Sequence, residues 1–215
     1  MLLSEVRFGS YLSYCPRGQS PEAVASRKFR DALKLDRVIL EPPRPTSLAL
    51  AERLAAAMDR TPLGSILGPN AVLVPAPKSS LLVRGGLWVP ERIASALVAV
   101  GLGREVLRCL ERTESVRKAA FSEAHERPRA SDHYRTMSVR GVASRPDKIV
   151  IVDDFVTRGA TLLAAASRIA ETWDGAAIAG FAMIRTVSNP DDFARIEESV
   201  VGTISLRGSE TRRRP

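Results

Sequence analysis

The sequence predicts an α/β fold in which helices cover both faces of a mostly parallel central sheet. Short runs made only of apolar residues, typical of buried strands, alternate along the chain with longer segments whose apolar residues recur at helical spacing. Strands that alternate with helices favour parallel pairing, with the helices packed on the two faces of the sheet. The length of 215 residues and the hydrophobic fraction of 45% fit one domain with a real core and some decoration.

A Pro-rich stretch at residues 41–45 separates an N-terminal segment from the rest of the chain. The segment before it, residues 1–40, is interpreted as a small strand pair plus a short helix. Gly101 and Gly103 end the second of the later helices. In chain order we expect a helix over 47–60, a strand over 71–74, a helix over 87–100, strands over 105–110 and 148–152, a helix over 160–171, and strands over 176–184 and 200–206.

Residues 111–140 interrupt this alternation. They are dense in Arg, Lys, Glu, Ser and His and contain few apolar anchors. Connections of this length within compact domains are usually functional or disordered. The sequence therefore predicts a long, partly mobile connection here.

The formal net charge of +8 favours a polyanionic partner. Nucleic acid is one candidate, and a sugar that carries both a phosphate and a pyrophosphate is another. The basic run Arg212–Arg214 is interpreted as a solvated tail.

The two cysteines, Cys15 and Cys109, lie far apart and fit no metal-ligand spacing, so two reduced thiols are expected. No apolar run approaches the ~18 residues that a membrane span needs. Residues 1–10 lack the apolar core of a secretory signal. A cytoplasmic protein without a membrane partner is the expectation.

The sharpest signal is the segment 149–161, with the sequence IVIVDDFVTRGAT. Four apolar residues predict a strand, Asp153 and Asp154 follow at its carboxyl end, and a Thr- and Gly-containing loop then opens a helix. Ligands of open α/β sheets bind beyond the carboxyl ends of the strands. Backbone N–H groups at the start of a helix bind anions, and Gly159 lets the backbone come close to a phosphate.

The two aspartates require a ligand that is not only a phosphate, because carboxylates repel phosphate oxygens. A sugar diol beside the phosphate satisfies both groups, since carboxylates accept hydrogen bonds from hydroxyls. Carboxylates also hold Mg²⁺, directly or through water. A solvated strand end and a phospho-receiver acid pair are alternatives, but neither accounts for the loop with Thr157, Gly159 and Thr161. The chain contains neither a P-loop motif nor a dinucleotide-binding motif.

This segment resembles the binding motif for 5-phosphoribosyl-1-pyrophosphate (PRPP) of the type I phosphoribosyltransferases. The resemblance implies the phosphoribosyltransferase fold, with Asp153 and Asp154 on the ribose 2- and 3-hydroxyls and on Mg²⁺. Arg158 stands where many relatives have Thr, Gly or Ala, which leaves the role of its side chain open. The residues implied to bind the 5-phosphate are Thr157, Arg158, Gly159, Ala160 and Thr161.

Two further segments are assigned through the same resemblance. The loop after the strand 71–74 is implied to bind pyrophosphate, and an ordinary turn with an exposed lysine is the alternative. Lys118, with Arg112 and Arg117, lies in a loop that would close over PRPP and balance the leaving pyrophosphate, and an exposed basic loop is the alternative. The pyrophosphate-binding candidates are Ala76, Pro77, Lys78 and Ser79.

The order of the pieces is similar to that of the ComF-type competence-protein phosphoribosyltransferases. The resemblance covers roughly residues 71–187 and is strongest at 148–163. It implies an N-terminal hood at 1–45, a phosphoribosyltransferase core at 46–208 and a basic tail at 209–215, and homodimers are common in this family. The cysteine-rich zinc module of many members is absent, since only Cys15 lies in that part of the chain.

The resemblance implies a glycosyltransferase reaction in which a nitrogen nucleophile displaces pyrophosphate at C1 of PRPP. Asp153, Asp154 and Lys118 are the candidate catalytic residues. Thr157 occupies the position of the general-base aspartate of 6-oxopurine enzymes, which disfavours hypoxanthine or guanine as the acceptor. The alternative is a protein that binds PRPP or nucleic acid as a regulator and does not turn PRPP over; the net charge of +8 favours it, although no helix-turn-helix is recognisable.

Overall fold

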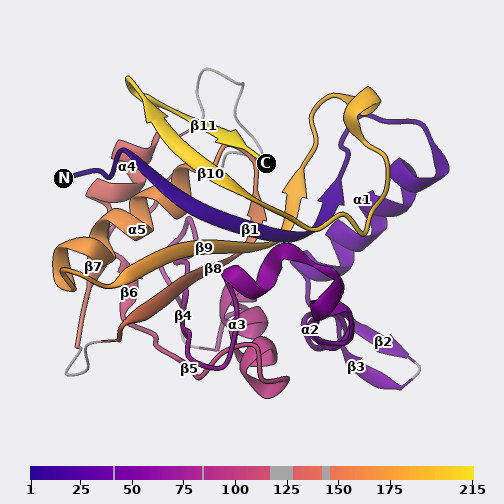
Figure 1. The fold of residues 1–215 in the computed structure, drawn as a ribbon, viewed down its shortest axis with the longest axis horizontal. Coiled ribbons are helices and arrows are strands. Elements are labelled where there is room, and N and C mark those ends of the chain that lie inside the picture. The colour runs from indigo at the N-terminus through magenta and orange to yellow at the C-terminus, as the bar shows by residue number, and fades with distance from the viewer. Residues whose placement is uncertain (41, 84, 117–127, 142–145) are drawn as a thin grey trace.

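The computed structural model describes residues 1–40, 42–83, 85–116, 128–141 and 146–215 (Figure 1). Its centre is a seven-stranded sheet with the order β11-β10-β1-β9-β8-β4-β5. The strands from β1 to β5 along this order run parallel to one another, and β10 and β11 are antiparallel additions at one edge. The strands are β1 Glu5–Tyr14, β4 Val72–Pro75, β5 Glu105–Val106, β8 Lys148–Val156, β9 Ala177–Thr186, β10 Val200–Arg207 and β11 Glu210–Arg214.

Helices cover both faces of this sheet, which confirms the predicted fold class (Figure 1). One face packs against α2 and α3, and the other against α5, on which α4 packs. Two small antiparallel hairpins lie outside the main sheet, β2 with β3 and β6 with β7. These elements are α1 Pro21–Lys34, α2 Thr46–Ala57, α3 Val89–Ala99, α4 Ala130–Arg135, α5 Ala160–Thr172, β2 Val38–Leu40, β3 Pro43–Pro45, β6 Leu110–Arg112, β7 Met137–Val139, and the 3-10 turns η1 Met58–Arg60, η2 Pro62–Ser65 and η4 Pro190–Asp192.

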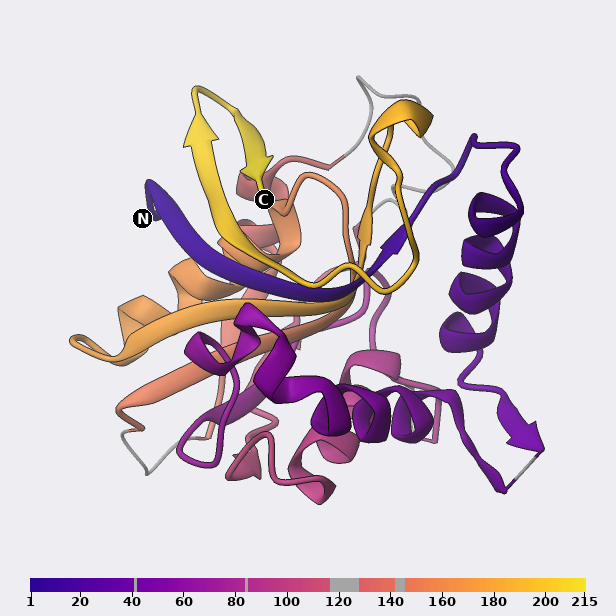
Figure 2. The same ribbon diagram turned by 45° about the vertical axis from the view of Figure 1, so that its right-hand side comes forward.

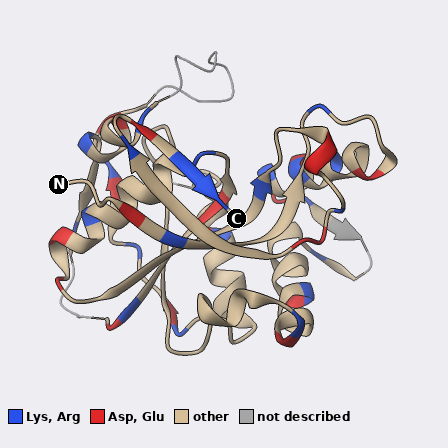
Figure 3. Ribbon diagram, turned by 45° about the horizontal axis from the view of Figure 1, so that its top comes forward, with Lys and Arg blue, Asp and Glu red and all other residues tan. Residues whose placement is uncertain are grey.

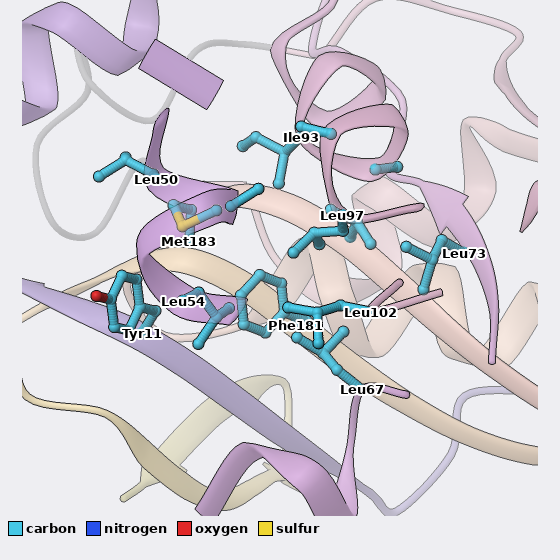
Figure 4. Packing of buried hydrophobic residues seen from close by; sticks show 14 of the residues in the cluster. Tyr11, Leu50, Leu54, Leu67, Leu73, Ile93, Leu97, Leu102, Phe181 and Met183 are labelled. Atoms are coloured by element: carbon cyan, nitrogen blue, oxygen red, sulfur yellow. The ribbon is translucent and has the colours of Figure 1, made fainter. Parts of the chain in front are cut away.

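The α2–α3 face holds the larger hydrophobic side chains (Figure 4). Leu54, Ile93 and Leu97 project from the two helices onto Phe181 of β9 and Leu73 of β4, and all five are fully buried. Burying a side chain of this size stabilises the fold by about 1.5–3 kcal/mol. This face of the sheet is therefore covered by two helices that also contact each other, although β4 separates them in the sequence.

The α5 face uses smaller residues. Ala164, Ala165 and Ala166 of α5 are fully buried in a helix that lies between the sheet and the pair α4 and β7. On the sheet side, Gly180 of β9 leaves room for Leu162, since a Cβ on this glycine would lie 3.1 Å from that side chain. Small residues on both partners let α5 approach the sheet closely, which fixes the position of its N-terminus.

The N-terminal segment differs from its prediction. β1 is not part of a small strand pair: it lies inside the main sheet, between β9 and β10. Residues 5–14 therefore belong to the core rather than to a hood. The expected short helix is α1, which has 14 residues. Together with the β2–β3 hairpin, α1 stands to one side of the sheet, near the end toward which β1 points (Figure 2).

Two predicted boundaries also require correction. The strand expected over 105–110 is two short strands, β5 and β6, of which only β5 joins the main sheet. The charged connection 111–140 contains secondary structure in its described parts, because β6, α4 and β7 fall within it. Both cysteines are free and buried, as expected for reduced thiols. No helix among the described residues is long and apolar enough to cross a membrane.

The basic C-terminal run forms a strand, so its interpretation as a solvated tail is wrong (Figure 3). Arg213 is mostly buried and stacks over the ring of Phe8 at 5.7 Å. Its Nε donates to the carbonyl oxygen of Thr157 at 2.9 Å, and its Nη2 donates to that of Thr186 at 2.6 Å. Burial lowers the pKa of Arg213 to about 10, with Arg185 adding to the effect, so the guanidinium stays charged at neutral pH.

We expect Arg213→Met to lower the free energy of unfolding by roughly 2–4 kcal/mol, because each hydrogen bond from a charged donor contributes about 1.5–3 kcal/mol. Urea denaturation followed by circular dichroism measures this change. Arg212→Met is the matched control, since Arg212 is exposed on the same strand, and its effect should stay within about 0.5 kcal/mol. Equal effects of the two substitutions would contradict the structural role of Arg213.

Candidate functional site

The two aspartates lie at a step in the sheet. β8 pairs with β4 only as far as Pro75 opposite Val152, and then continues alone along β9 to Val156. The sequence placed the end of this strand at Val152, but Asp153 and Asp154 are still within it. They therefore sit where β8 has lost one neighbour, above the carboxyl end of β4. The loop after β4 begins at this point, with the amide of Ala76 donating to the carbonyl of Val152 at 2.8 Å.

The carboxyl groups of Asp153 and Asp154 are close neighbours in a largely dry environment. Asp153 is only 9% exposed and accepts a hydrogen bond from the amide of Asp154 at 2.9 Å. Asp154 is half-buried and accepts one from the amide of Phe155 at 2.9 Å. Burial raises the pKa of Asp153 well above its usual range, the charge of Asp154 raises it further, and Arg112 acts in the opposite direction.

Neither Asp153 nor Asp154 forms an ion pair with a described residue. A cation between or beside the two carboxylates would relieve both their repulsion and their desolvation. The described part of the chain offers no cluster of three or more metal-ligating side chains. The donor set of two carboxylates fits Mg²⁺, which usually keeps waters and substrate oxygens as its other ligands.

The loop after β8 leads directly into the first turn of α5. Gly159 is the N-cap of α5 in the left-handed conformation, with φ of 88°, and no side chain caps the helix. The first N–H groups of the helix have no partner within it, and with the helix dipole they form an anion site. A Cβ on Gly159 would lie 2.5 Å from Ile204 of β10, so only glycine lets this loop pack on the sheet.

The side chains of the loop are tied to neighbouring strands. The hydroxyl of Thr157 lies 3.1 Å from that of Thr186 at the end of β9. Arg158 forms an ion pair of 2.8 Å with Glu210 of β11. Contacts with β9 and β11 therefore hold the loop in place. The role of its main-chain amides toward a phosphate stays a prediction.

The loop after β4 is ordered by contacts of its own. Ala76 and Pro77 are buried, and the carbonyl of Ala76 accepts from the indole of Trp88 at 2.8 Å. The ammonium of Lys78 donates to the carbonyl of Leu87 at 2.8 Å, and the carbonyl of Ser79 accepts from the amide of Val116 at 2.7 Å. The role of these residues toward pyrophosphate stays a prediction. Lys118 and Arg117 lie outside the described residues.

Arg112 connects this loop to the acidic pair. It is buried, and its guanidinium donates to the carbonyls of Lys78 at 3.1 Å and His133 at 3.2 Å and to the hydroxyl of Thr136 at 2.7 Å. Burial lowers its pKa to about 10, while Asp153 acts to raise it. Arg112 therefore places a fixed positive charge near Asp153, rather than in the mobile loop to which the sequence assigned it.

His133 completes the surroundings of Arg112. Its Nδ1 lies 3.3 Å from Nη2 of Arg112, and since a guanidinium only donates, Nδ1 accepts and the imidazole is neutral. Burial and the charge of Arg112 lower the pKa of His133 to about 4. The unfolded chain binds this proton near the ordinary value of about 6.5.

We expect His133 to make the fold less stable as the pH falls from about 6.5 toward 4, because the unfolded state holds the extra proton in that window. The loss amounts to at most ~1.4 kcal/mol per pH unit. Urea denaturation of the protein and of His133→Gln at about pH 7 and about pH 5 measures it. The difference in stability between the two proteins should shrink at the lower pH. Parallel pH profiles would show that His133 does not contribute this dependence.

The positions of several residues around the site were not predicted from the sequence. Arg213 was assigned to a tail, although it lies on β11 and donates hydrogen bonds to the carbonyls of Thr157 and Thr186. Tyr14 and Phe155 end up side by side at the ends of β1 and β8, with their ring centroids 6.2 Å apart. Phe155 directly follows Asp154, which was a usable signal. The positions of Arg213 and Tyr14 depend on contacts between distant parts of the chain.

Comparison with known proteins gives a limited likeness to phosphoribosyltransferases. No protein-family model matches the chain. The orotate phosphoribosyltransferase of Lactobacillus johnsonii is 36% identical over 75 residues, which are 35% of this chain and 34% of that protein. The chain therefore matches about a third of the length of this relative. Among solved structures, the adenine phosphoribosyltransferase of Leishmania tarentolae aligns over 65% of this chain and 70% of its own, with 19% identity and a TM-score of 0.27.

Proposed function

We propose that this chain is a type I phosphoribosyltransferase that binds Mg²⁺ and PRPP and transfers ribose 5-phosphate to a nitrogenous acceptor. The observation that carries the proposal is the pair Asp153 and Asp154, unpaired with any described base, directly before a loop whose amides open α5. A diol-binding acid pair next to an anion-binding helix start matches the two ends of a ribose 5-phosphate. The likeness over 75 residues to an orotate phosphoribosyltransferase supports the same reaction class.

In this proposal each part of the site contacts one part of the substrate. Asp153 and Asp154 accept hydrogen bonds from the ribose hydroxyls, and the amides of residues 157–161 bind the 5-phosphate. The loop Ala76–Ser79 lies beyond the neighbouring strand β4, where it would meet the pyrophosphate, with Lys118 as the closing residue. Mg²⁺, held by the two carboxylates, would supply charge neutralisation for the departing pyrophosphate.

The reaction is a substitution at C1 of the ribose. The electron pair of an acceptor nitrogen forms the new bond to C1 while the C1–O bond breaks and its electrons leave with pyrophosphate. An N–H acceptor also gives up its proton to water. Positive charge develops on the ribose in the transition state, and the carboxylates of Asp153 and Asp154 stabilise it electrostatically.

Finer assignments belong to the same proposal. The order of motifs favours the ComF-type branch, and Thr157 in the place of a general-base aspartate disfavours 6-oxopurine acceptors. The same proposal includes a role in nucleotide metabolism, a cytoplasmic location, which the two free cysteines support, and a homodimer.

We expect the double substitution Asp153→Asn and Asp154→Asn to weaken binding of PRPP in the presence of Mg²⁺ by about a hundredfold or more. Each hydrogen bond to a charged group contributes roughly 1.5–3 kcal/mol, and two such losses correspond to that factor. Isothermal titration calorimetry measures the affinity. The matched control is Asp191→Asn with Asp192→Asn, an exposed pair of adjacent aspartates in η4. A correctly folded 153/154 variant that still binds PRPP normally would remove the assignment.

A regulatory protein that binds PRPP or nucleic acid without turnover is the second candidate, because the net charge is +8. Mixing radiolabelled PRPP with a panel of nitrogenous bases separates the two. Base-dependent release of pyrophosphate supports the enzyme, whereas saturable binding without release under any base supports the regulator.

A further inference from the structure

The C-terminal hairpin of β10 and β11 contacts three consecutive residues of the loop that follows β8. The contacts are a hydrogen bond, an ion pair and an apolar contact, and they come from both strands of the hairpin. The pairs are Arg213 with Thr157 at 2.9 Å, Glu210 with Arg158 at 2.8 Å, and Ile204 with Gly159, where an added Cβ would lie 2.5 Å from the Ile204 side chain. This loop therefore packs directly against the hairpin.

Arg213 makes the contact that sets the orientation of the loop. Both side chains of the ion pair are exposed, at 37% and 49%, and such pairs contribute little to stability. The apolar contact has no preferred direction, because burial of apolar surface is non-directional. The guanidinium of Arg213, in contrast, donates to the carbonyl of Thr157 and, at 2.6 Å, to that of Thr186.

The peptide plane links this hydrogen bond to the direction of the next amide. In a trans peptide the C=O and the following N–H lie in one plane and point in opposite directions. Because Arg213 holds the carbonyl oxygen of Thr157 on the side of the hairpin, the N–H of Arg158 points away from the hairpin. The loop amides therefore take part of their orientation from β11.

The two hydrogen bonds alone do not explain the charge of Arg213, because a neutral donor could make them. No described carboxylate forms an ion pair with Arg213, and its buried Nη1 has no hydrogen-bond partner among the described residues. Burial and the neighbouring charge of Arg185 both lower the pKa of Arg213, so its surroundings disfavour the cation. An anion bound on the other side of the loop would favour it.

We propose that Arg213 is a positioning residue for the 5-phosphate of PRPP. It fixes the amides of residues 157–161 through the carbonyl of Thr157, and it places a positive charge behind them. The inference rests on the proposed function, which assigns the 5-phosphate to these amides. It adds to the site a residue of the C-terminal strand, far from the acidic pair in sequence.

The test measures binding of PRPP with Mg²⁺, without an acceptor, by isothermal titration calorimetry on variants whose folding circular dichroism has confirmed. We expect Arg213→Met to weaken binding by about tenfold or more, because charge-assisted hydrogen bonds to the phosphate lose their geometry. Arg213→Lys keeps the charge but lacks the planar fork of donors, so it should weaken binding less. Arg212→Met is the control, since Arg212 is exposed on the same strand, and it should leave the affinity unchanged.

A phosphorus NMR spectrum of bound PRPP separates positioning of one phosphate from a general loss of structure. The 5-phosphate and the pyrophosphate give separate resonances, and an excess of protein keeps PRPP bound when its affinity is reduced. We expect Arg213→Met to move the resonance of the 5-phosphate and to leave those of the pyrophosphate in place, because the proposed pyrophosphate loop follows another strand.

The proposal is overturned by unchanged affinity in a folded Arg213→Met variant, or by an equal loss in Arg212→Met or in Arg213→Lys. A stationary 5-phosphate resonance, or movement of the pyrophosphate resonances as well, also overturns it. So does failure of both Arg213 variants to fold, since Arg213 would then be required for the fold itself. In each case the unmodified protein still binds PRPP and the proposed function stands. If the unmodified protein does not bind PRPP, the proposed function and this inference are overturned together.

Discussion

Two carboxyl groups on consecutive residues of a buried strand are costly, and the arrangement of this site follows from that cost. Asp153 loses most of its hydration and also experiences the charge of Asp154, and both effects raise its pKa. A fold that needed only a stable sheet would place apolar residues here, as it does at Ile149, Ile151 and Val152. The cost of desolvation and charge repulsion falls if a cation or sugar hydroxyls occupy the step above β4. The acidic pair is therefore best explained by a ligand.

Asp153 and Asp154 form no ion pair with the nearby arginines, because other groups hold those arginine side chains. Arg112 donates to two backbone carbonyls and a hydroxyl, and Arg213 donates to two backbone carbonyls. Both guanidinium groups brace loops of the site, yet neither forms an ion pair with Asp153 or Asp154. A direct pair would neutralise the carboxylates and compete with a metal or a sugar. Holding arginines through carbonyls supplies rigidity and a nearby positive charge without that competition.

Local parts of the structure could be predicted from the sequence, and parts that depend on distant pairing could not. The path from Ile149 to the start of α5 is continuous, so strand, acids, glycine and helix follow from neighbouring residues. The place of β1 in the sheet could not be predicted, because its partners are residues 179–186 and 200–205. The burial of Arg213 could not be predicted for the same reason. Three consecutive arginines indicate solvent exposure unless their cross-strand neighbours are known. The step at Val152 was also missed, since it depends on where β4 ends rather than on β8.

The charges around the site also constrain the order of events in the proposed reaction. A phosphorylated ligand entering an empty site would meet two carboxylates at close range, and at an effective dielectric near 20 a like-charge pair about 4 Å apart costs roughly 4 kcal/mol. Mg²⁺ held by the two carboxylates offsets that repulsion. Electrostatics thus favours binding of Mg²⁺ before PRPP or together with it. In that order, the phosphate groups approach carboxylates whose charge the metal already offsets.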